Sequence, residues 1–272
     1  MSSAHHSKFI LWLTLPTALL IILASSVGLS VNDFYGKESF NWQAQSIGQD
    51  LVDLFLVVPC LLITGFLSWR NYRVAIVLWG GVVLYLIYTF IIYCFDVHFN
   101  NLFVIYCFIL GLSFYSFIYF LSEQSKESFV TEFQNSLPVR VVGIYFLVIP
   151  ALFYFLWLSE IIPAIIQNTT PKNLIETGLP TNPVHVIDLA LFLPGLFIIG
   201  ILMLKRKPMG LLFAPAILTF FVLMDITIGF LIIVMKHRGL ESNLAITIVM
   251  AVLALFSMTM LIWYLRNMKQ PL

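Results

Sequence analysis

The segments DLFLVVPCLLITGFLSWR (53–70) and DLALFLPGLFIIGILMLK (188–205) decide the expected fold. Each begins with an aspartate, continues as a run of apolar residues and ends in a cation, Arg70 or Lys205. A helix of about 20 apolar residues crosses the roughly 30 Å hydrocarbon core of a bilayer, and each segment approaches that length. The two match at eight of eighteen positions and lie 135 residues apart in a chain of 272. The pair therefore predicts a membrane protein that arose by internal duplication.

The composition of the whole chain supports a lipid environment. Hydrophobic residues make up 61% of the chain and charged residues 10%, with a formal net charge of +1. A soluble protein carries about 25% charged residues and about 45–50% apolar ones. These values argue against a soluble globular protein and a disordered one. They also argue against a nucleic-acid-binding protein, which needs a basic surface. The expected partner of this chain is the lipid bilayer.

Apolar segments long enough to span a membrane recur along the chain. They are apolar on all sides and lack the alternating pattern of a membrane β-barrel strand, so we expect helices. The connections between them are short, so no soluble domain is expected. The fold class is therefore an all-α integral membrane protein with eight spans, at residues 9–31, 51–69, 74–95, 102–121, 141–166, 184–204, 209–235 and 244–265.

The distribution of basic residues predicts the orientation. Ten of the 14 lysines and arginines fall at the ends of the spans that share a side with the two termini. The other four fall on the opposite side, at Lys37, Lys172, Lys236 and Arg238. Loops rich in lysine and arginine stay in the cytoplasm, so we expect both termini there, in an inner (plasma) membrane.

The matched segments predict two four-helix repeats, residues 1–136 and 137–272. Leucines match by chance in such sequences, but Pro59 aligns with Pro194 and Gly65 with Gly200, which are rarer residues. Each repeat has an even number of spans, so the two are parallel and related by a pseudo-twofold axis along the membrane normal. Substrate sites in transporters built from repeats lie at the repeat interface. Accidental similarity between apolar helices is the alternative.

Four acidic residues lie at membrane depth and are the candidate substrate- or ion-binding residues. A charged residue at the centre of a spanning helix costs about 2.5–3.5 kcal/mol on insertion scales, and such residues usually face a cavity or the bundle interior. Asp53, Glu160, Asp188 and Asp225 are expected in the outer half of the membrane, with no lysine or arginine at the same depth. Asp53 and Asp188 would bind the ligand, and Asp225 with Glu160 would exchange protons.

Two pairs with helical spacing suit a metal ion. Asp50 and Asp53 are three residues apart, as are His185 and Asp188, and the pairs occupy equivalent positions in the two repeats. If spans 2 and 6 meet, three carboxylates and one imidazole converge. Such ligands bind divalent cations such as Zn²⁺, Mn²⁺ or Mg²⁺, so a divalent metal is the candidate cofactor. The same groups could instead bind a cationic or hydroxylated organic molecule.

Structural roles are the alternative for each of these acids. Asp50, Asp53 and Asp188 fall near the expected N-terminal ends of helices, where the helix dipole favours an acid. Asn182 and Pro183 resemble an N-cap and first helical position. Glu160 could reach the outer interface. Asp225 could be a protonated acid that is hydrogen-bonded to a neighbouring helix.

These observations favour transporter-like handling of a cation or small polar molecule. The alternatives are a membrane-embedded enzyme that acts on a lipid or isoprenoid, and a subunit or sensor that binds another membrane protein or a second copy. The sequence contains no HExxH, GxSxG, P-loop or GxGxxG motif, which leaves an enzymatic activity open. We expect an enzyme to open sideways to lipid beside its acids, and a subunit to lack a cavity.

Overall fold

The computed structural model describes residues 3–124 and 138–268, with side chains from Lys8 onward. The described chain is helical, and eight of its helical segments are long and apolar enough to cross a membrane, as predicted. Two of the eight are interrupted by a π-helical turn, labelled η. The elements are α1 (Ser3–Ser30), α2 (Phe40–Val52), η1 (Asp53–Val57), α3 (Val58–Trp69), α4 (Arg73–Asp96), α5 (Phe103–Gln124), α6 (Val139–Gln167), α7 (Lys172–Thr177), α8 (Pro183–Ile187), η3 (Asp188–Phe192), α9 (Leu193–Leu204), α10 (Pro208–His237) and α11 (Leu244–Arg266).

The second span begins earlier than the sequence predicts. Its helix starts at Phe40, so residues 40–50, expected in a loop, are helical. The Ser39 side chain caps this helix by accepting a hydrogen bond of 3.1 Å from the Trp42 N–H. The polar residues of α2 lower its hydropathy, although partners in the same helix, in the α1–α2 loop and on α4 bond to them inside the bundle. Asp50 and Asp53 therefore lie inside a continuous helical segment, and their interpretation as acids of a first helical turn is wrong.

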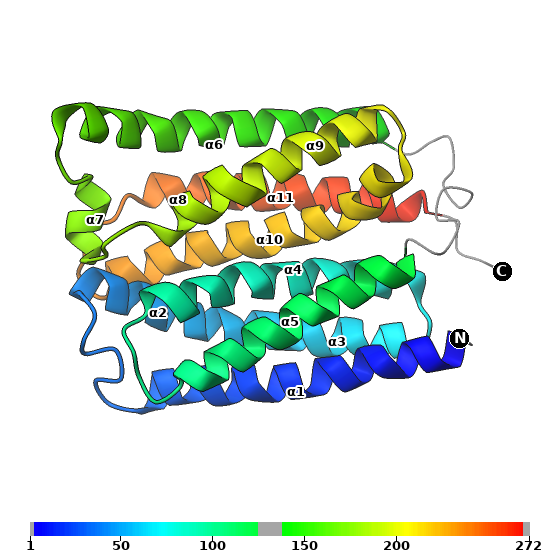
Figure 1. Ribbon diagram of the computed structural model, residues 1–272, viewed down its shortest axis with the longest axis horizontal. Coiled ribbons are helices and arrows are strands. Elements are labelled where there is room, and N and C mark those ends of the chain that lie inside the picture. Colours follow the sequence, from blue (N-terminus) through cyan, green and yellow to red (C-terminus); the bar gives the residue numbers. More distant parts are fainter. Residues whose placement is uncertain (1–2, 125–137, 269–272) are drawn as a thin grey trace.

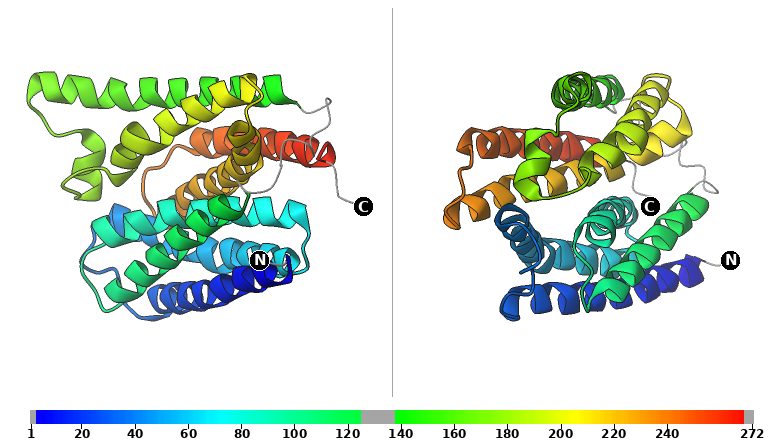
Figure 2. Two further views of the ribbon diagram at one scale, coloured as in Figure 1. Left: turned by 45° about the vertical axis from the view of Figure 1, so that its right-hand side comes forward. Right: turned by 60° about the vertical axis from the view of Figure 1, so that its left-hand side comes forward.

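Two groups of helices meet at a central pair. α1 to α5 form one group and α6 to α11 the other, with α4 and α10 side by side between them (Figures 1 and 2). α4 and α10 are the most enclosed spans, with 72% and 56% of their apolar windows buried, against 22–44% for the others. Gly81 permits their close approach, because a Cβ there would overlap the Ala216 carbonyl and the Thr219 side chain. Spans 2 and 6 do not pack together as supposed; spans 3 and 7 do.

A π-helical turn occurs at the same position in each group. The Val58 N–H donates to the carbonyl of Asp53, five residues back, and the Leu193 N–H donates to that of Asp188. Each turn is followed by a proline, Pro59 or Pro194, which has no N–H to continue the regular ladder. Such turns are frequent at functional sites. η3, α9 and α10 each begin 135 residues after η1, α3 and α4.

The two groups differ in how their first helix packs. α1 packs along both α3 and α5, so the first group is closed. α6 packs along α9, and contacts α11 through Tyr145, whose hydroxyl lies 2.8 Å from that of Ser257. The Tyr145 ring also contacts Phe256, with ring centroids 5.0 Å apart. α6 and α11 are therefore in contact at Tyr145 and pack loosely beyond it.

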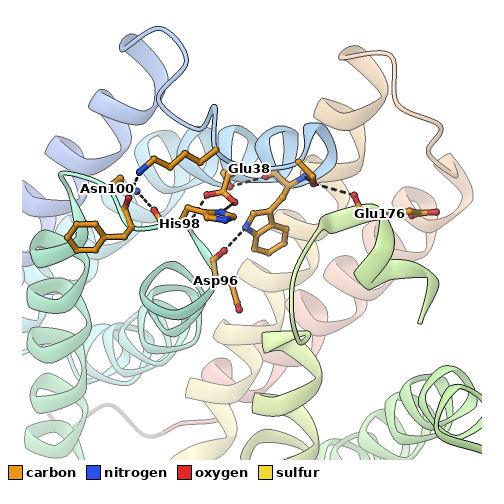
Figure 3. A network of polar contacts seen from close by, with 10 residues as sticks. Glu38, Asp96, His98, Asn100 and Glu176 are labelled. Carbon is orange, nitrogen blue, oxygen red and sulfur yellow. Dashed lines mark hydrogen bonds and ion pairs between the residues drawn. The ribbon is translucent and has the colours of Figure 1, made fainter. Parts of the chain in front are cut away.

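A polar network ties together the end of the bundle that carries α7, which we call the α7 end (Figure 3). Glu38 accepts hydrogen bonds from the His98 N–H at 2.7 Å and has the His98 ring nitrogen at 2.8 Å. The Trp42 indole donates to the Asp96 carbonyl at 3.2 Å, and the Ser39 hydroxyl donates to the Glu176 carbonyl at 3.3 Å. These bonds join the α1–α2 loop, the α4–α5 connection and α7.

Candidate functional site

A cavity of about 440 Å³ lies between the two groups of helices. Its volume falls within the roughly 300–1,000 Å³ of typical ligand pockets. α2 and α4 form one wall, and α6, the α8–α9 span, α10 and α11 form the other. Most lining side chains are apolar, and no lysine or arginine is among the described residues that line it. The polar and amphipathic lining residues are Trp42, Gln45, Ser46, Gln49, Tyr88, Thr89, Tyr93, Tyr145, Trp157, Asp188, Asp225 and Thr227.

Asp225 lines this cavity and has one carboxylate oxygen without a partner. The residue is 8% exposed, and its Oδ2 atom has no hydrogen-bond partner among the described residues. Ser257, which is hydrogen-bonded to Tyr145, also lies within interaction range of the Asp225 carboxyl. Asp225 precedes the end of α10 by 12 residues, which places it about 18 Å along the helix from the α7 end. A buried, unpaired acceptor of this kind costs free energy unless a ligand or a proton satisfies it.

Asp188 also lines the cavity, but two side chains satisfy it. Its Oδ1 accepts a hydrogen bond of 3.0 Å from Tyr88 of α4, and its Oδ2 accepts one of 2.9 Å from Trp157 of α6. The turn itself is also satisfied, because the Tyr154 hydroxyl donates to the Leu189 carbonyl at 3.0 Å. That carbonyl lies five residues before Pro194, which has no N–H to offer it. Asp188 thus joins three helices at the edge of the cavity.

Aromatic rings close the cavity on the side away from α7. Phe192 and Phe220 lie 4.3 Å apart between ring centroids, and Tyr88 lies 5.6 Å from Phe220. Tyr145 and Phe221 continue the layer at 5.7 Å. We call these five residues the aromatic floor. Four helical segments contribute to it, so a passage through it requires these segments to move apart.

The cavity opens between α6 and α11. Of the residues that line it, two are exposed, Leu156 (52%) on α6 and Ile246 (43%) on α11. Both lie within membrane-spanning segments. Ile246 is two residues from the start of α11, and Ser257 beside Asp225 lies 11 residues further along that helix. The opening therefore lies towards the α7 end, about 16 Å along α11 from the depth of Asp225.

Asp50, predicted as a metal ligand, is enclosed within the first group. It is 2% exposed and accepts hydrogen bonds from Tyr35 at 2.6 Å and Tyr93 at 2.8 Å. Burial and the nearby Asp50 carboxylate raise the pKa of the Tyr35 hydroxyl well above its usual value, so Tyr35 remains a proton donor. A Cβ at Gly28 would overlap the Asp50 carboxylate. Asp50 is thus packed and satisfied as part of the protein interior.

Asp53 is fully buried and belongs to a hydrogen-bond chain beside the cavity. Its Oδ1 accepts a bond of 2.9 Å from Gln49, whose side-chain nitrogen also donates to Tyr85 at 2.8 Å. The Tyr85 hydroxyl lies 2.8 Å from that of Thr227 on α10. The Asp53 Oδ2 has no partner among the described residues, but Asp53 does not line the cavity. Only Gln49 and Thr227 connect this chain to the cavity wall.

His185 and Glu160 lie behind the cavity wall. His185 is 7% exposed and its ring contacts that of Trp157, with centroids 4.6 Å apart. Its backbone N–H donates to Asn182, which caps α8 as the sequence predicts. Glu160 is half-buried and close enough to His185 to interact electrostatically, but neither residue lines the cavity.

The structure brings together two of the predicted site residues, Asp188 and Asp225, and separates the others from them. In the two described ranges, no group of three or more His, Cys, Asp or Glu side chains is placed to hold a metal ion. The divalent metal site formed by the two helical pairs therefore stays a sequence-based prediction. Asp50 and Asp53 face the interior of the first group, while His185 and Asp188 belong to the second.

Sequence reasoning missed three of the four residues that complete the site, namely Trp157, Tyr145 and Ser257. Tyr88 and Trp157 bind Asp188, and Tyr145 and Ser257 lie beside Asp225. Their hydroxyl and indole groups at membrane depth are the signal that could have pointed to them, because such groups usually find a partner when buried. Chemically, the site offers one free carboxylate oxygen within apolar walls. Comparisons of the chain with protein-family models, curated proteins and solved structures found no match.

Proposed function

We propose that the protein is a transporter-like membrane protein that binds a cation or small polar molecule in the cavity between its two groups of helices. The observation that carries this proposal is Asp225, a residue that lines that cavity and whose buried Oδ2 is unpaired. The described lining offers no basic side chain to neutralise the carboxylate. A positively charged or hydrogen-bond-donating ligand would supply the missing partner.

The proposal includes two parallel four-helix repeats, residues 1–136 and 137–272. The equal spacing of η1, α3 and α4 from η3, α9 and α10 supports this arrangement. The packing between the groups is also reciprocal, because α10 contacts α2 and α4 contacts α8. A pseudo-twofold axis between α4 and α10 relates these contacts, and the cavity then lies at the repeat interface, where transporters of this type bind substrate.

The proposed orientation places both termini in the cytoplasm of a plasma membrane. It rests on the excess of lysine and arginine at the ends that share a side with the termini. The α7 end then faces outward, and the cavity lies in the outer half of the membrane above the aromatic floor. This arrangement corresponds to a state closed on the cytoplasmic side.

Movement of one group against the other would open the opposite side. The contact at Gly81, where α4 meets α10, is the natural pivot because two backbones approach closely there. Tyr88 belongs to the first group and the other four rings to the second, so this movement would separate Tyr88 from Phe220 and Phe192 and open the aromatic floor at that edge. Asp225 lies next to the aromatic floor on α10, on the side of the α7 end, and would then release its ligand and bind a proton.

Thermal unfolding of the detergent-purified protein tests the binding step. The probes are Mg²⁺, Zn²⁺, ethylamine and dodecylamine, applied to wild type, Asp225→Asn and Asp53→Asn. Asp53 is the matched control, because it is buried and unpaired at Oδ2 but lies outside the cavity. We expect at least one probe to raise the unfolding temperature of wild type and Asp53→Asn, since a ligand of the native state stabilises it, and to lose this effect in Asp225→Asn. Equal stabilisation of all three proteins, or of none, would overturn the assignment of Asp225.

A membrane-embedded enzyme that acts on a lipid or isoprenoid is the second candidate. The opening at Leu156 and Ile246 favours it, because it lies between two spanning helices and leads into a cavity that has an acid on its wall. A positioned carboxyl group can act as a general acid or base. Mass spectrometry of lipids incubated with wild type and Asp225→Asn distinguishes the candidates: a product formed by wild type alone indicates an enzyme, and ligand uptake into vesicles without a product indicates a transporter.

A further inference from the structure

We propose that the ligand is a lipophilic amine, with one protonated nitrogen on an apolar body, and that it reaches Asp225 from the bilayer between α6 and α11. This inference rests on the proposed function, since it names the class of molecule that the same cavity binds. It goes further in excluding small hydrophilic cations and anionic lipids, and in assigning a route of entry. Three features of the cavity carry it: the charge at its inner end, the nature of its walls and the position of its opening.

The charge of the cavity selects the head of the ligand. Asp225 offers a free acceptor oxygen, and the hydroxyls of Tyr145 and Ser257 lie nearby. A protonated amine carries donors for these groups and forms charge-assisted hydrogen bonds with the carboxylate. A phosphate-bearing headgroup is disfavoured, because the described lining contains two carboxyl groups and no lysine or arginine to neutralise a phosphate.

The walls select an apolar body. Four lining residues, Met224, Ile228, Leu231 and Met235, recur along α10 at intervals of four, three and four residues, which places them on one face of the helix. This apolar stripe runs from beside Asp225 towards the α7 end over about 16 Å. Met250 of α11 also lines the cavity. Methionine side chains adapt to ligands of different shape, so the walls suit a flexible chain or a compact ring system. A hydrophilic cation would leave these walls uncovered.

The opening sets the route. Leu156 and Ile246 are exposed within the spans, and both also line the cavity. The loose packing of α6 against α11 beyond Tyr145 leaves this side without a covering helix among the described elements. On the α7 end, by contrast, the bonds of Glu38, Ser39 and Trp42 join loops and α7. A molecule that enters from the bilayer between α6 and α11 therefore bypasses that network and reaches Asp225 along the apolar stripe of α10.

The first experiment tests the ligand class with the full-length protein in nanodiscs of zwitterionic lipid. The probes are dodecylamine, dodecanol with the same chain but no charge, dodecanoate with the opposite charge, and ethylamine with the same head but no body. We expect dodecylamine to bind tightest, and Asp225→Asn to weaken its binding about tenfold or more, because a hydrogen bond to a charged group is lost. Asp225→Glu should retain most of the affinity. Asp33→Asn, which removes one charge from an exposed loop, is the matched control and should bind as wild type does.

Each other outcome has a distinct meaning. Equal binding of dodecanol and dodecylamine would overturn the amine assignment in favour of a neutral lipid. Binding of ethylamine or a metal ion alone would overturn the lipophilic class but leave the proposed function in place. Absence of binding by every probe, with wild type and variants equally stable, would overturn both proposals. The unfolding temperature of each variant without ligand shows whether it is folded.

The second experiment tests the route. The double variant Leu156→Trp/Ile246→Trp fills the opening, and Leu152→Trp/Ile248→Trp places the same bulk on exposed positions of the same two helices outside the cavity lining. We expect the association rate of dodecylamine to fall about tenfold in the first variant and to remain that of wild type in the second. An equal rate in both variants would overturn entry between α6 and α11.

Discussion

The two groups of helices contain buried acids in different circumstances. In the first group, Asp50 is enclosed by helices and satisfied by Tyr35 and Tyr93. In the second group, Asp225 lies on a cavity wall with an unpaired oxygen, while Asp188 is satisfied by Tyr88 and Trp157. An acid at membrane depth is therefore an insufficient sign of a site. Asp53 also keeps an unpaired oxygen but lies outside the cavity. An unpaired oxygen together with a position on the cavity wall therefore separates a binding acid from a structural one.

The difference arises from the packing of one helix in each group. α1 contacts both α3 and α5 and closes the first group, whereas α6 packs along α9 and leaves a gap beside α11. The gap exposes Leu156 and Ile246 and admits the cavity between the groups. The same order of helices thus produces a packed interior in one group and a pocket in the other.

The largest expected effect comes from removing the enclosed acid. Asp50→Ala leaves the hydroxyls of Tyr35 and Tyr93 without their acceptor in a buried space. We expect the free energy of unfolding to fall by about 3–5 kcal/mol, because each unsatisfied buried group costs about 1–3 kcal/mol and a cavity adds to that. Asp225→Ala is the counterpart in the second group and should cost only about 1 kcal/mol, because its Oδ2 has no partner to lose and only the interaction with Ser257 is removed. Chemical unfolding in detergent measures both, and equal losses would show that the two acids are alike.

A smaller effect is expected from a methyl group next to the same acid. Gly28→Ala places a Cβ against the Asp50 carboxylate, and overpacking of this kind costs about 1–3 kcal/mol. Gly195→Ala on α9 is the matched control, because a Cβ there meets no atom within 4 Å. It should be neutral or stabilising, since alanine is the better helix former. If Gly28→Ala were as stable as Gly195→Ala, the tight enclosure of Asp50 would be disproved.

The smallest expected effect concerns the satisfied acid of the cavity. Tyr88→Phe removes one of the two hydrogen bonds of Asp188 and should lower the free energy of unfolding by about 1 kcal/mol. Tyr115→Phe on α5 is the control, because Tyr115 is 68% exposed and the change should be neutral. Thermal unfolding of the two variants side by side measures the difference. A Tyr88→Phe protein as stable as its control would show that this bond does not hold α4 to the second group.

Much of the fold follows from local properties of the chain. Runs of apolar residues with few charges predict eight spans, and eight helices of the described chain satisfy that prediction. The predicted start of the second span was wrong. Gln49 and Asp50 resemble loop residues in the sequence, but in the structure Gln49 bonds to Tyr85, and Asp50 accepts hydrogen bonds from Tyr35 and Tyr93. A hydropathy value reports the free energy of transferring an isolated side chain from water to an apolar medium. It does not include hydrogen bonds that other helices supply in the folded protein.

The sequence by itself determined the helical membrane class, the spans and the acids that lie at depth. Only the tertiary structure decided which of these acids lines the cavity with an unpaired oxygen. The donors to Asp188 come from Trp157, 31 residues away, and from Tyr88, 100 residues away, on separate helices. Spacing along one helix cannot reveal such partners, because they depend on how helices pack against each other. The cavity beside Asp225 likewise depends on the packing of all the helices, because α6 packs mainly along α9 and contacts α11 only locally.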